Sequence, residues 1–449
     1  MESRQAHVLR PDSPGWDDAR QAWNLALDQQ PEAIVVAEST EDVIGAVEYA
    51  LQNGLRVAAQ ATGHGAKALG PLAGTLLIRT RMHGVEIDAE ARRVRVEAGT
   101  PWREILQAAG RHGLAGLAGS APDVGVVGYS ISGGLSFLGR KYGLAAHSIG
   151  AAEVVTADGR LVHANEESST ELLWALRGGG GNFGAVTALE LELVPLSEVY
   201  AGILWFPLER AAEVLHAWAE MTRDGLPDEL TTIGRLLQLP PLPEIPEPVR
   251  GKSFAVVEAI HCGAGAEADA LLQPLRALRP AMDTMGPVPI PDLGRLHMDP
   301  DHPVPAVGDG TALETLPTDA IDELVRTAGP GSGSPLLSVE VRQLGGALGQ
   351  PRPDHAALAA APGEYALYAV GIAATPEIAS ANEAQIGRLK EAMLPWTTPG
   401  IVANFAETRR DPTSLWGEDA VARLRKLKEE IDPGNVFRSN HPLLVETAR

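Results

Sequence analysis

Glycine clusters in the first half of the chain restrict its fold more than any other feature. Each cluster follows or interrupts an apolar run, and the clusters are Gly63 with Gly65, then Gly125, Gly128, Gly133 and Gly134, and then 178–181 with Gly184. Glycine lets the backbone take positive φ angles and approach a ligand closely. One cluster alone predicts a turn, so the information lies in their order along the chain.

Short strands and helices alternate around these clusters. The apolar pattern predicts strands at 33–37, 56–61, 75–79, 93–97, 153–157, 160–163 and 185–194. Helices are expected at 43–52, after the capping residues 39–42, and from Pro101 to residue 110. This alternation indicates an α+β fold.

From residue 199 onward the chain has Pro-rich stretches between alternating strands. Strands are expected at 254–260, 337–341 and 365–372, with helices at 208–222 and 266–279. We interpret this region as an antiparallel sheet backed by helices. The last helix, 418–431, is stopped by residues 432–434. The expected division is therefore 1–198, 199–397 and 398–449.

Composition excludes several classes of protein. Lys and Arg number 37 against 58 Asp and Glu, which gives a net charge of −21, and no basic stripe suits a nucleic acid. The single cysteine, Cys262, excludes an internal disulfide framework and a cysteine-rich metal site. Residues 1–5 show no apolar leader and no apolar run reaches membrane-spanning length, so we expect a cytoplasmic protein without a membrane partner.

Common glycine motifs do not explain the clusters. Residues 63–68 match the dinucleotide fingerprint G-x-G-x-x-G/A, but Gly70 and Pro71 leave no room for the helix that it requires. The run 178–184 lacks the Lys-Ser/Thr pair of a P-loop. Ser132 stands where a nucleophile elbow needs glycine.

Taken in order, the clusters resemble one family. The matching motifs are AQATGHG at 59–65, PDVGVVG at 122–128, SGG at 132–134, RKYGL at 140–144, VVTADG at 154–159, LWALRGGGGNFG at 173–184, NF at 404–405 and IDPGNVFR at 431–438. They cover nearly the whole chain. The chain thus resembles the berberine-bridge-enzyme-like branch of the vanillyl-alcohol-oxidase/PCMH flavoprotein superfamily.

The resemblance implies a PCMH-type FAD-binding domain of two α/β subdomains, formed by 1–198 and 398–449, with a substrate domain at 199–397. Glycine turns at 61–66 and 122–134 can present backbone N–H groups to the FAD pyrophosphate. The FAD-binding residues that the resemblance implies are Ala61, Thr62, Gly63, His64, Gly65, Ala66, Pro122, Asp123, Val124, Gly125, Gly128, Tyr129, Ser132, Gly133, Gly134, Gly184, Val186, Asn404 and Asn440.

His64 is the residue that the resemblance singles out. In the family the matching histidine is bonded covalently to the 8α-methyl of the flavin. The alternative is a loop histidine that makes one hydrogen bond. Many relatives have a second, cysteinyl tether, and that position is Ala121 here, while Cys262 lies far along the chain. The resemblance therefore implies one covalent link, through His64.

Two other positions bear on the flavin. Tyr129 stands where many relatives have a histidine near the flavin, so we expect it to influence catalysis through the reduced cofactor. Val124 matches a position described in relatives as a gatekeeper for dioxygen, and its small side chain favours an oxidase. A plain packing valine is the alternative interpretation.

On the substrate side, alternation in a strand places Glu340 and Arg342 on one face and Val339, Val341 and Gln343 on the other. Glu340 is a candidate base, and Arg342 is a candidate ligand for an anionic or carbonyl group. A cross-strand ion pair or a solvated face explains the pattern equally well.

Other polar side chains have no assigned role. Phe405 replaces a tyrosine of many relatives and cannot act as a base, and Tyr365 and Tyr368 have no assigned face. His297, Asp299, Asp301 and His302 alternate with Pro300 and Pro303, which favours a rigid loop over a metal site. No metal is expected.

The expected activity is that of an FAD-dependent oxidase. A hydride passes from a C–OH, C–N or activated C–C centre of a small molecule to flavin N5, and dioxygen is reduced to hydrogen peroxide. Two alternatives stay open. One is a dehydrogenase that uses a quinone or protein acceptor, and the other is a flavin-binding protein without catalysis.

Overall fold

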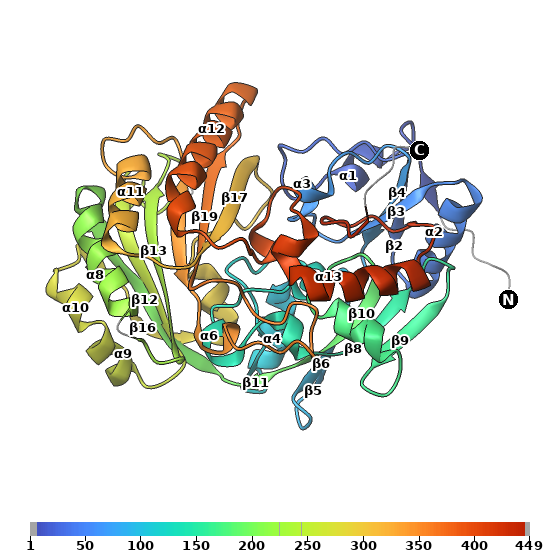
Figure 1. Ribbon diagram of the computed structural model, residues 1–449, viewed down its shortest axis with the longest axis horizontal. Coiled ribbons are helices and arrows are strands. Elements are labelled where there is room, and N and C mark those ends of the chain that lie inside the picture. Colours follow the sequence, from blue (N-terminus) through green and yellow to red (C-terminus); the bar gives the residue numbers. More distant parts are fainter. Residues whose placement is uncertain (1–6, 224, 244, 445–449) are drawn as a thin grey trace.

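The first half of the chain forms two sheets of different kinds (Figure 1). The computed structural model describes residues 7–223, 225–243 and 245–444, so residues 1–5, on which the expectation of no leader rests, lie outside it. The four-stranded sheet has parallel strands β2 (Ala33–Ala37), β4 (Thr75–Thr80) and β3 (Arg56–Gln60), with β1 (Val8–Leu9) antiparallel beside β2. The antiparallel five-stranded sheet has the order β5 (Val85–Asp88), β6 (Arg93–Glu97), β10 (Ala185–Glu192), β8 (Ile149–Val155) and β9 (Leu161–Asn165).

Short helices join these strands. They are α1 (Trp16–Arg20), α2 (Thr40–Gln52), α3 (Ala66–Leu69), α4 (Trp102–Gly110), α5 (Val126–Ile131), α6 (Gly139–Tyr142) and α7 (Thr170–Leu176). The hydroxyl of Ser39 accepts a hydrogen bond from the Asp42 amide at 3.2 Å and caps α2. Helix α3 ends just before Gly70, as the sequence predicted. A two-stranded pair, β7 (Leu114–Ala115) with β11 (Val194–Pro195), leads into the second half.

Helix α2 connects the two sheets. Its buried residues Val43, Ala46, Val47 and Ala50 are spaced on one helical face. They belong to a core that also contains buried residues of β2, β4, β6, β8 and β10. The two sheets therefore share one apolar interior, and the loops at their ends are held in a fixed relation.

The second half forms an antiparallel eight-stranded sheet. Its order is β15 (Met282–Asp283), β12 (Glu198–Pro207), β14 (Ser253–His261), β13 (Leu230–Gln238), β18 (Ser338–Gln343), β19 (Tyr365–Ile372) and β17 (Ala306–Leu313), with β16 (Gly286–Pro289) beside β12. The helices that share its core are α8 (Ala211–Arg223), α9 (Gly265–Leu271), α10 (Gln273–Ala277), α11 (Thr318–Ala328) and α12 (Pro376–Met393). In Figure 1 α8 to α11 lie at the left and α12 stands at the top. An α+β fold with an antiparallel sheet backed by helices is confirmed.

Some elements differ from the sequence prediction. The helix expected at 266–279 is two helices, α9 and α10. Helices α11 and α12 were not predicted from the sequence. In α12 the buried face includes the polar residues Asn382 and Gln385, which donate to the carbonyl oxygens of Ile372 and Thr327. Polar residues on the buried face weaken the apolar period by which a helix is recognised.

The C-terminal segment returns to the first sheet. After α13 (Pro412–Ile431), Val57 donates its amide hydrogen bond to the Val436 carbonyl and accepts one from the Arg438 amide, both at 2.8 Å. Residues 436–438 thus run parallel beside β3. The exact limits 198/199 and 397/398 stay predictions. Within the described part of the chain, no helix is both long enough and apolar enough to cross a membrane.

Candidate active site

The loop after β3 places His64 among three other side chains. His64 Nδ1 is 2.8 Å from Thr62 Oγ1, and its ring stacks on Trp23 with 4.4 Å between the centroids. His64 Nε2 lies 3.5 Å from Asp123 Oδ1, and Trp23 Nε1 donates to Asp123 Oδ2 at 2.6 Å. We call residues 61–66 the first glycine loop and residues 122–134 the second glycine loop. The two loops therefore meet at His64 and Asp123.

The same loop has backbone amides that are available to bind a ligand. Among the described residues, the amides of Gly63, His64 and Gly65 donate no hydrogen bond. Gly63 has φ +89°, and a Cβ there would lie 2.8 Å from Gln60 Nε2, so the turn requires glycine. Asn440 Nδ2 donates to the Gly65 carbonyl at 2.7 Å. The C-terminal segment thus holds a loop whose amides face no acceptor of the described chain.

Asn404 connects the second glycine loop to the C-terminal segment. Its Oδ1 accepts from the Gly134 amide at 2.7 Å, and its Nδ2 donates to the Tyr129 carbonyl at 3.1 Å. The Gly125 amide donates to Thr62 Oγ1 at 3.4 Å, which joins the two loops directly. The structure therefore brings both loops, Asn404 and Asn440 together.

The other residues expected at the flavin lie on or beside these loops. Gly133 packs against Asn404, and Gly184 and Val186 lie against Val154 on the neighbouring strand β8. The remaining members of the expected set are placed on the first loop (Ala61), at its end where α3 starts (Ala66), on the second loop before α5 (Pro122, Val124) and in or just after α5 (Gly128, Ser132). Ala121 directly precedes the second loop, whereas Cys262 directly follows β14 in the other sheet.

Two buried polar atoms at this place have no partner except each other. His64 Nε2 and Asp123 Oδ1 lie 3.5 Å apart and make no hydrogen bond with any other described residue. Burial raises the pKa of Asp123. The hydrogen bond and charge of His64 and the hydrogen bond from Trp23 lower this pKa by more than burial raises it, so the net shift is downward. Buried polar atoms without partners are rare in folded proteins. Together with the unbonded loop amides, they fit a bound FAD.

Tyr129 lies beside the loops without touching a polar partner. Its hydroxyl is buried and makes no hydrogen bond within the described residues, and its ring meets Trp102 edge-on at 5.5 Å. Burial raises the pKa of Tyr129. It is therefore a neutral phenol at ordinary pH, and its expected role at the reduced flavin stays a prediction.

Glu340 and Arg342 lie on the sheet face opposite the helices, as the alternation predicted. Val339 and Val341 belong to the helix-side core. Glu340 and Arg342 are only 3% and 8% exposed, so the interpretation as a solvated face is wrong. Arg342 Nε donates to Glu340 Oε1 at 2.9 Å, and its guanidinium lies over Phe405 with 5.1 Å to the ring centroid.

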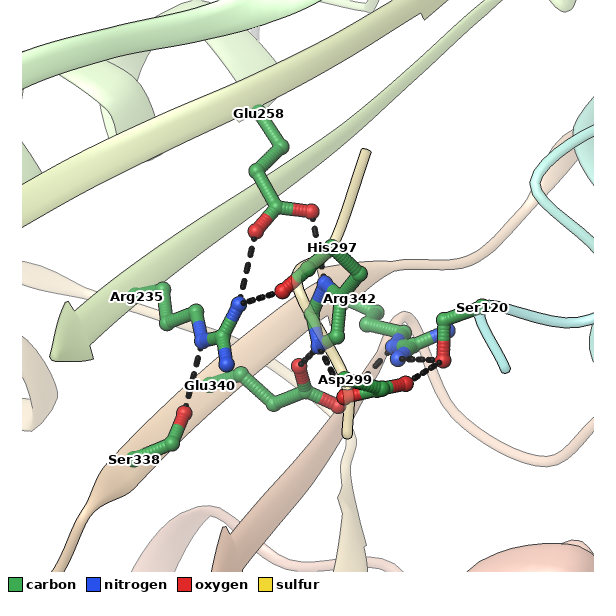
Figure 2. A network of polar contacts seen from close by, with 8 residues as sticks. All are labelled: Ser120, Arg235, Glu258, His297, Asp299, Ser338, Glu340 and Arg342. Carbon is green, nitrogen blue, oxygen red and sulfur yellow. Dashed lines mark hydrogen bonds and ion pairs between the residues drawn. The ribbon is translucent and has the colours of Figure 1, made fainter. Parts of the chain in front are cut away.

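His297 joins this pair to a larger network (Figure 2). Its Nε2 lies 2.8 Å from Glu340 Oε2, and its Nδ1 is 2.7 Å from Glu258 Oε2. Arg235 donates to Glu258 Oε1 at 3.0 Å and to Ser338 Oγ at 2.7 Å. The sequence pattern predicted only a rigid loop for this segment, and the buried role of His297 was missed because its partners lie on distant strands.

Asp299 connects the network to the segment just before the second glycine loop. Ser120, which directly precedes Ala121, donates to Asp299 Oδ2 at 2.8 Å, and Arg342 Nη2 donates to Ser120 Oγ at 3.4 Å. Asp301 and His302 of the same loop are exposed. Among the residues placed by the structure, no group of three or more His, Cys, Asp and Glu is arranged to hold a metal ion.

The network sets the charges of its members. Burial and Arg235 lower the pKa of His297, but the carboxylates of Glu258, Asp299 and Glu340 outweigh them and raise it to about 9. Burial raises the pKa of Glu340, but Arg342 and His297 outweigh it and hold that pKa far below its usual range. Glu340 is thus a poor proton acceptor, which weakens the expectation that it is the base.

Tyr368 and Glu407 form a second polar pair, which no local sequence pattern predicts. Tyr368 pairs in register with Glu340 and faces the same side, and its hydroxyl donates to Glu407 Oε1 at 3.1 Å. A Cβ on Gly308 would lie 2.4 Å from this hydroxyl, so the ring needs glycine there. Burial raises the pKa of Glu407 to about 7, although the Tyr368 bond and Lys67 lower it.

Tyr365 provides the contrast on the same strand. Its hydroxyl lies 2.8 Å from Thr222 Oγ1 in the helix-side core. Strand alternation therefore separates the two phenols, Tyr365 away from the site and Tyr368 toward it. The same alternation in residues 365–372 was a signal from which Tyr368 could have been found.

Comparison with known families agrees with this geometry. An FAD binding domain model matches residues 31–165, and a model described as berberine and berberine like matches residues 403–443. The (R)-6-hydroxynicotine oxidase of Paenarthrobacter nicotinovorans is 27% identical over 461 residues, which cover 98% of this chain and 96% of that protein.

Two further proteins are similar over most of their length. A chitooligosaccharide oxidase of Gibberella zeae is 26% identical over 462 residues, 95% of this chain and 90% of that protein. The solved structure of a berberine-bridge-enzyme-like protein of Physcomitrella patens superposes with a TM-score of 0.84 at 19% identity, over 99% of this chain and 98% of that one. The resemblance stated from the sequence is confirmed, and FAD is the cofactor that the matched domain binds.

The raised pKa of His297 predicts a pH-dependent stability. Folding favours its protonated form, so this contribution is complete below the ordinary pKa of 6.5 and is lost as the pH rises through about 9. The free energy of unfolding, measured with urea, should fall over this range. His297→Gln should remove that fall and cost about 3–5 kcal/mol at pH values below it.

His302→Gln is the matched control, because His302 lies on the same loop but is exposed. It should retain the stability and pH profile of the unmodified protein. An unchanged pH profile in His297→Gln would contradict the assignment of a buried charged histidine.

Proposed function

We propose that this chain, a member of the berberine-bridge-enzyme-like FAD-linked oxidoreductases, is an oxidase of a small organic substrate. The substrate has a C–OH, C–N or activated C–C centre that loses two electrons and two protons in total, one proton leaving with both electrons as a hydride and the other going to a base. FAD supplies the hydride acceptor and the reaction with dioxygen that gives hydrogen peroxide. In this proposal residues 1–198 and 398–449 hold the cofactor, and 199–397 cover it.

One observation carries the proposal. The unbonded amides of 63–65 and the His64 ring, whose Nε2 has only a 3.5 Å contact with Asp123 Oδ1, lie on one side of the site. The polar face of the eight-stranded sheet is joined by the Arg342–Ser120 hydrogen bond to the segment just before the second glycine loop, and Asn404 bonds the Gly134 amide within that loop. A cofactor held by these loops has a charged protein surface next to it, where a polar substrate can be oriented. The names of relatives as oxidases support the reaction type.

Dioxygen as the acceptor is the first part to test. Val124 is half-buried on the second loop, and its side chain is small. Protein reduced with dithionite and mixed with air-saturated buffer should reoxidise at least about tenfold faster than free flavin and release hydrogen peroxide. A rate equal to that of free flavin, with rapid turnover on a quinone, would establish the dehydrogenase alternative instead.

A covalent bond through His64 is the second prediction. His64 stacks on Trp23, its Nδ1 is bonded to Thr62, and its Nε2 makes only a 3.5 Å contact with Asp123, so the ring is held in place by its neighbours. After precipitation with acid, yellow colour and in-gel flavin fluorescence should stay with the polypeptide. His64→Ala should release the flavin into the supernatant.

His163→Ala is the matched control, since His163 is an exposed histidine on β9. It should keep the flavin in the pellet. Flavin that washes out of the unmodified protein would rule out the covalent link while leaving FAD binding intact. Failure of any alcohol or amine in a broad panel to bleach the bound flavin would favour a binding protein without catalysis.

We further propose that Tyr368 takes the proton of the substrate hydroxyl or amine and passes its own proton to Glu407. Both side chains keep accessible surface, whereas Glu340 and Arg342 are buried and paired with each other. Ionised Glu407 accepts the Tyr368 proton through the existing 3.1 Å hydrogen bond. A proton acceptor works best when its pKa is close to the working pH, and the pKa of Glu407 is about 7.

This proton path predicts a pH profile. Because Glu407 must be ionised, the rate of substrate oxidation should rise as the pH passes through about 7 and then level off. Tyr368→Phe and Glu407→Gln should each lower this rate by about 100-fold or more and remove the rise. Stopped-flow bleaching of the flavin, measured across the pH range, gives the profile.

Tyr365→Phe is the matched control on the same strand. It removes a hydroxyl in the helix-side core, so it should cost about 1 kcal/mol of stability but keep the rise near neutral pH. A Tyr368→Phe variant with an unchanged profile would return the role of base to Glu340.

A further inference from the structure

Arg79 occupies a ligand-binding position in the first sheet. It is the second-last residue of β4, which lies between the parallel strands β2 and β3, and its register partners are Val36 and Gln60. Paired residues present their side chains to the same face of a sheet. Arg79 therefore lies beside Gln60, the residue that directly precedes the loop 61–65. Open parallel sheets bind ligands at the carboxyl ends of their strands.

The guanidinium of Arg79 is buried without compensation. The residue is 4% exposed, and its Nε and Nη1 make no hydrogen bond within the described residues. The charged group that acts on it is another cation, Arg81. Two residues earlier on the three strands, Ile34, Leu77 and Ala58 form part of an apolar cluster on the same face.

Arg79 keeps its charge in this environment. Burial and the charge of Arg81 lower its pKa to about 10, which still leaves it protonated at neutral pH. A buried cation without an anion is costly, and native proteins pair such charges. Every other buried arginine discussed above has an acceptor: Arg235 has Glu258, and Arg342 has Glu340. No anion among the described residues matches Arg79, so this place suits an anionic ligand.

The neighbouring loop indicates the chemistry of that anion. The unbonded amides of Gly63, His64 and Gly65 begin three residues after Gln60. Consecutive free amides form a nest for phosphate oxygens, and a guanidinium is the side chain best suited to phosphate. FAD carries a diphosphate, and the matched FAD-binding domain contains both Arg79 and the loop.

We propose that Arg79 binds the diphosphate of FAD together with the backbone amides of residues 63–65. The inference rests on FAD as the cofactor and is independent of the substrate and of the covalent link. Arg79 supplies the positive charge, and the amides donate hydrogen bonds that orient the phosphate oxygens. With this contact, the protein discriminates against flavins that lack phosphate.

Direct binding measurements test this role. In a full-length His64→Ala background, which leaves the flavin exchangeable, the dissociation constants of FAD, ADP, inorganic phosphate and riboflavin are measured by fluorescence quenching or calorimetry. Arg79→Leu should weaken FAD and ADP by about 10- to 100-fold, because a charge-assisted hydrogen bond is lost, and should leave riboflavin unchanged. Arg79→Lys should lie between.

Arg81→Leu is the matched control, because Arg81 is an exposed arginine two residues further along the chain. It should bind FAD like the parent. Inorganic phosphate that competes with ADP only when Arg79 is present would support the site, because phosphate then binds the same groups. Equal FAD affinity in the Arg79→Leu and Arg81→Leu variants, or equal weakening of FAD and riboflavin, would overturn the proposal.

Thermal unfolding gives a second readout that a structural role would not produce. Without FAD, Arg79 is an uncompensated buried charge, so apo Arg79→Leu should melt no lower than the apo parent. With FAD, the order should reverse, because only the parent gains the phosphate contact. An apo variant that melts well below the apo parent would show a structural role instead. If the unmodified protein binds no FAD at all, the proposed function fails, whereas FAD binding that ignores Arg79 refutes only this inference.

Discussion

A charge buried in a protein needs a partner, because its loss of hydration costs several kcal/mol. On the eight-stranded sheet the chain supplies all the partners itself, since the cations Arg235, His297 and Arg342 alternate with Glu258, Asp299 and Glu340 (Figure 2). At the end of the parallel strands, Arg79 Nε and Nη1 make no hydrogen bond with the described residues, and the amides of 63–65 donate none. The network on the eight-stranded sheet therefore has balanced charges without a ligand. The groups at the end of the parallel strands stay available to the cofactor.

The C-terminal part of the chain returns to both sheets and helps to form both of these regions. Residues 403–407 cross β17 where Gly308 and Gly310 leave its surface bare, and a Cβ at Gly310 would lie 2.7 Å from the Phe405 carbonyl oxygen. The crossing brings Asn404 to the second glycine loop and Glu407 to Tyr368. Further on, the strand-like residues 436–438 carry Asn440 to the His64 loop. Small residues on one sheet and polar side chains on the returning segment therefore build the site jointly.

Much of the site could be inferred from local patterns. The order of the glycine motifs identified the two loops, and alternation in β18 put Glu340 and Arg342 on one face. His297 was not found, because its partners are Glu258 and Glu340 on two different strands. Tyr368 was found only as a spare phenol, since its role depends on Glu407, 39 residues away. The periodicity of a strand predicts the face on which a side chain lies. It does not predict which residues from other parts of the chain contact that side chain.

By itself, the sequence determined the features that depend on neighbouring residues. These are the turn that requires Gly63, the capping of α2, the α+β class and the face on which each strand residue lies. Only the tertiary structure decided which buried charges have a partner of opposite charge. Glu340 is paired with Arg342, whereas Arg79 has no such partner among the described residues. The physical reason is that backbone geometry is a local property, whereas the electrostatic state of a buried group is set by residues that are far apart in the chain and meet only after folding.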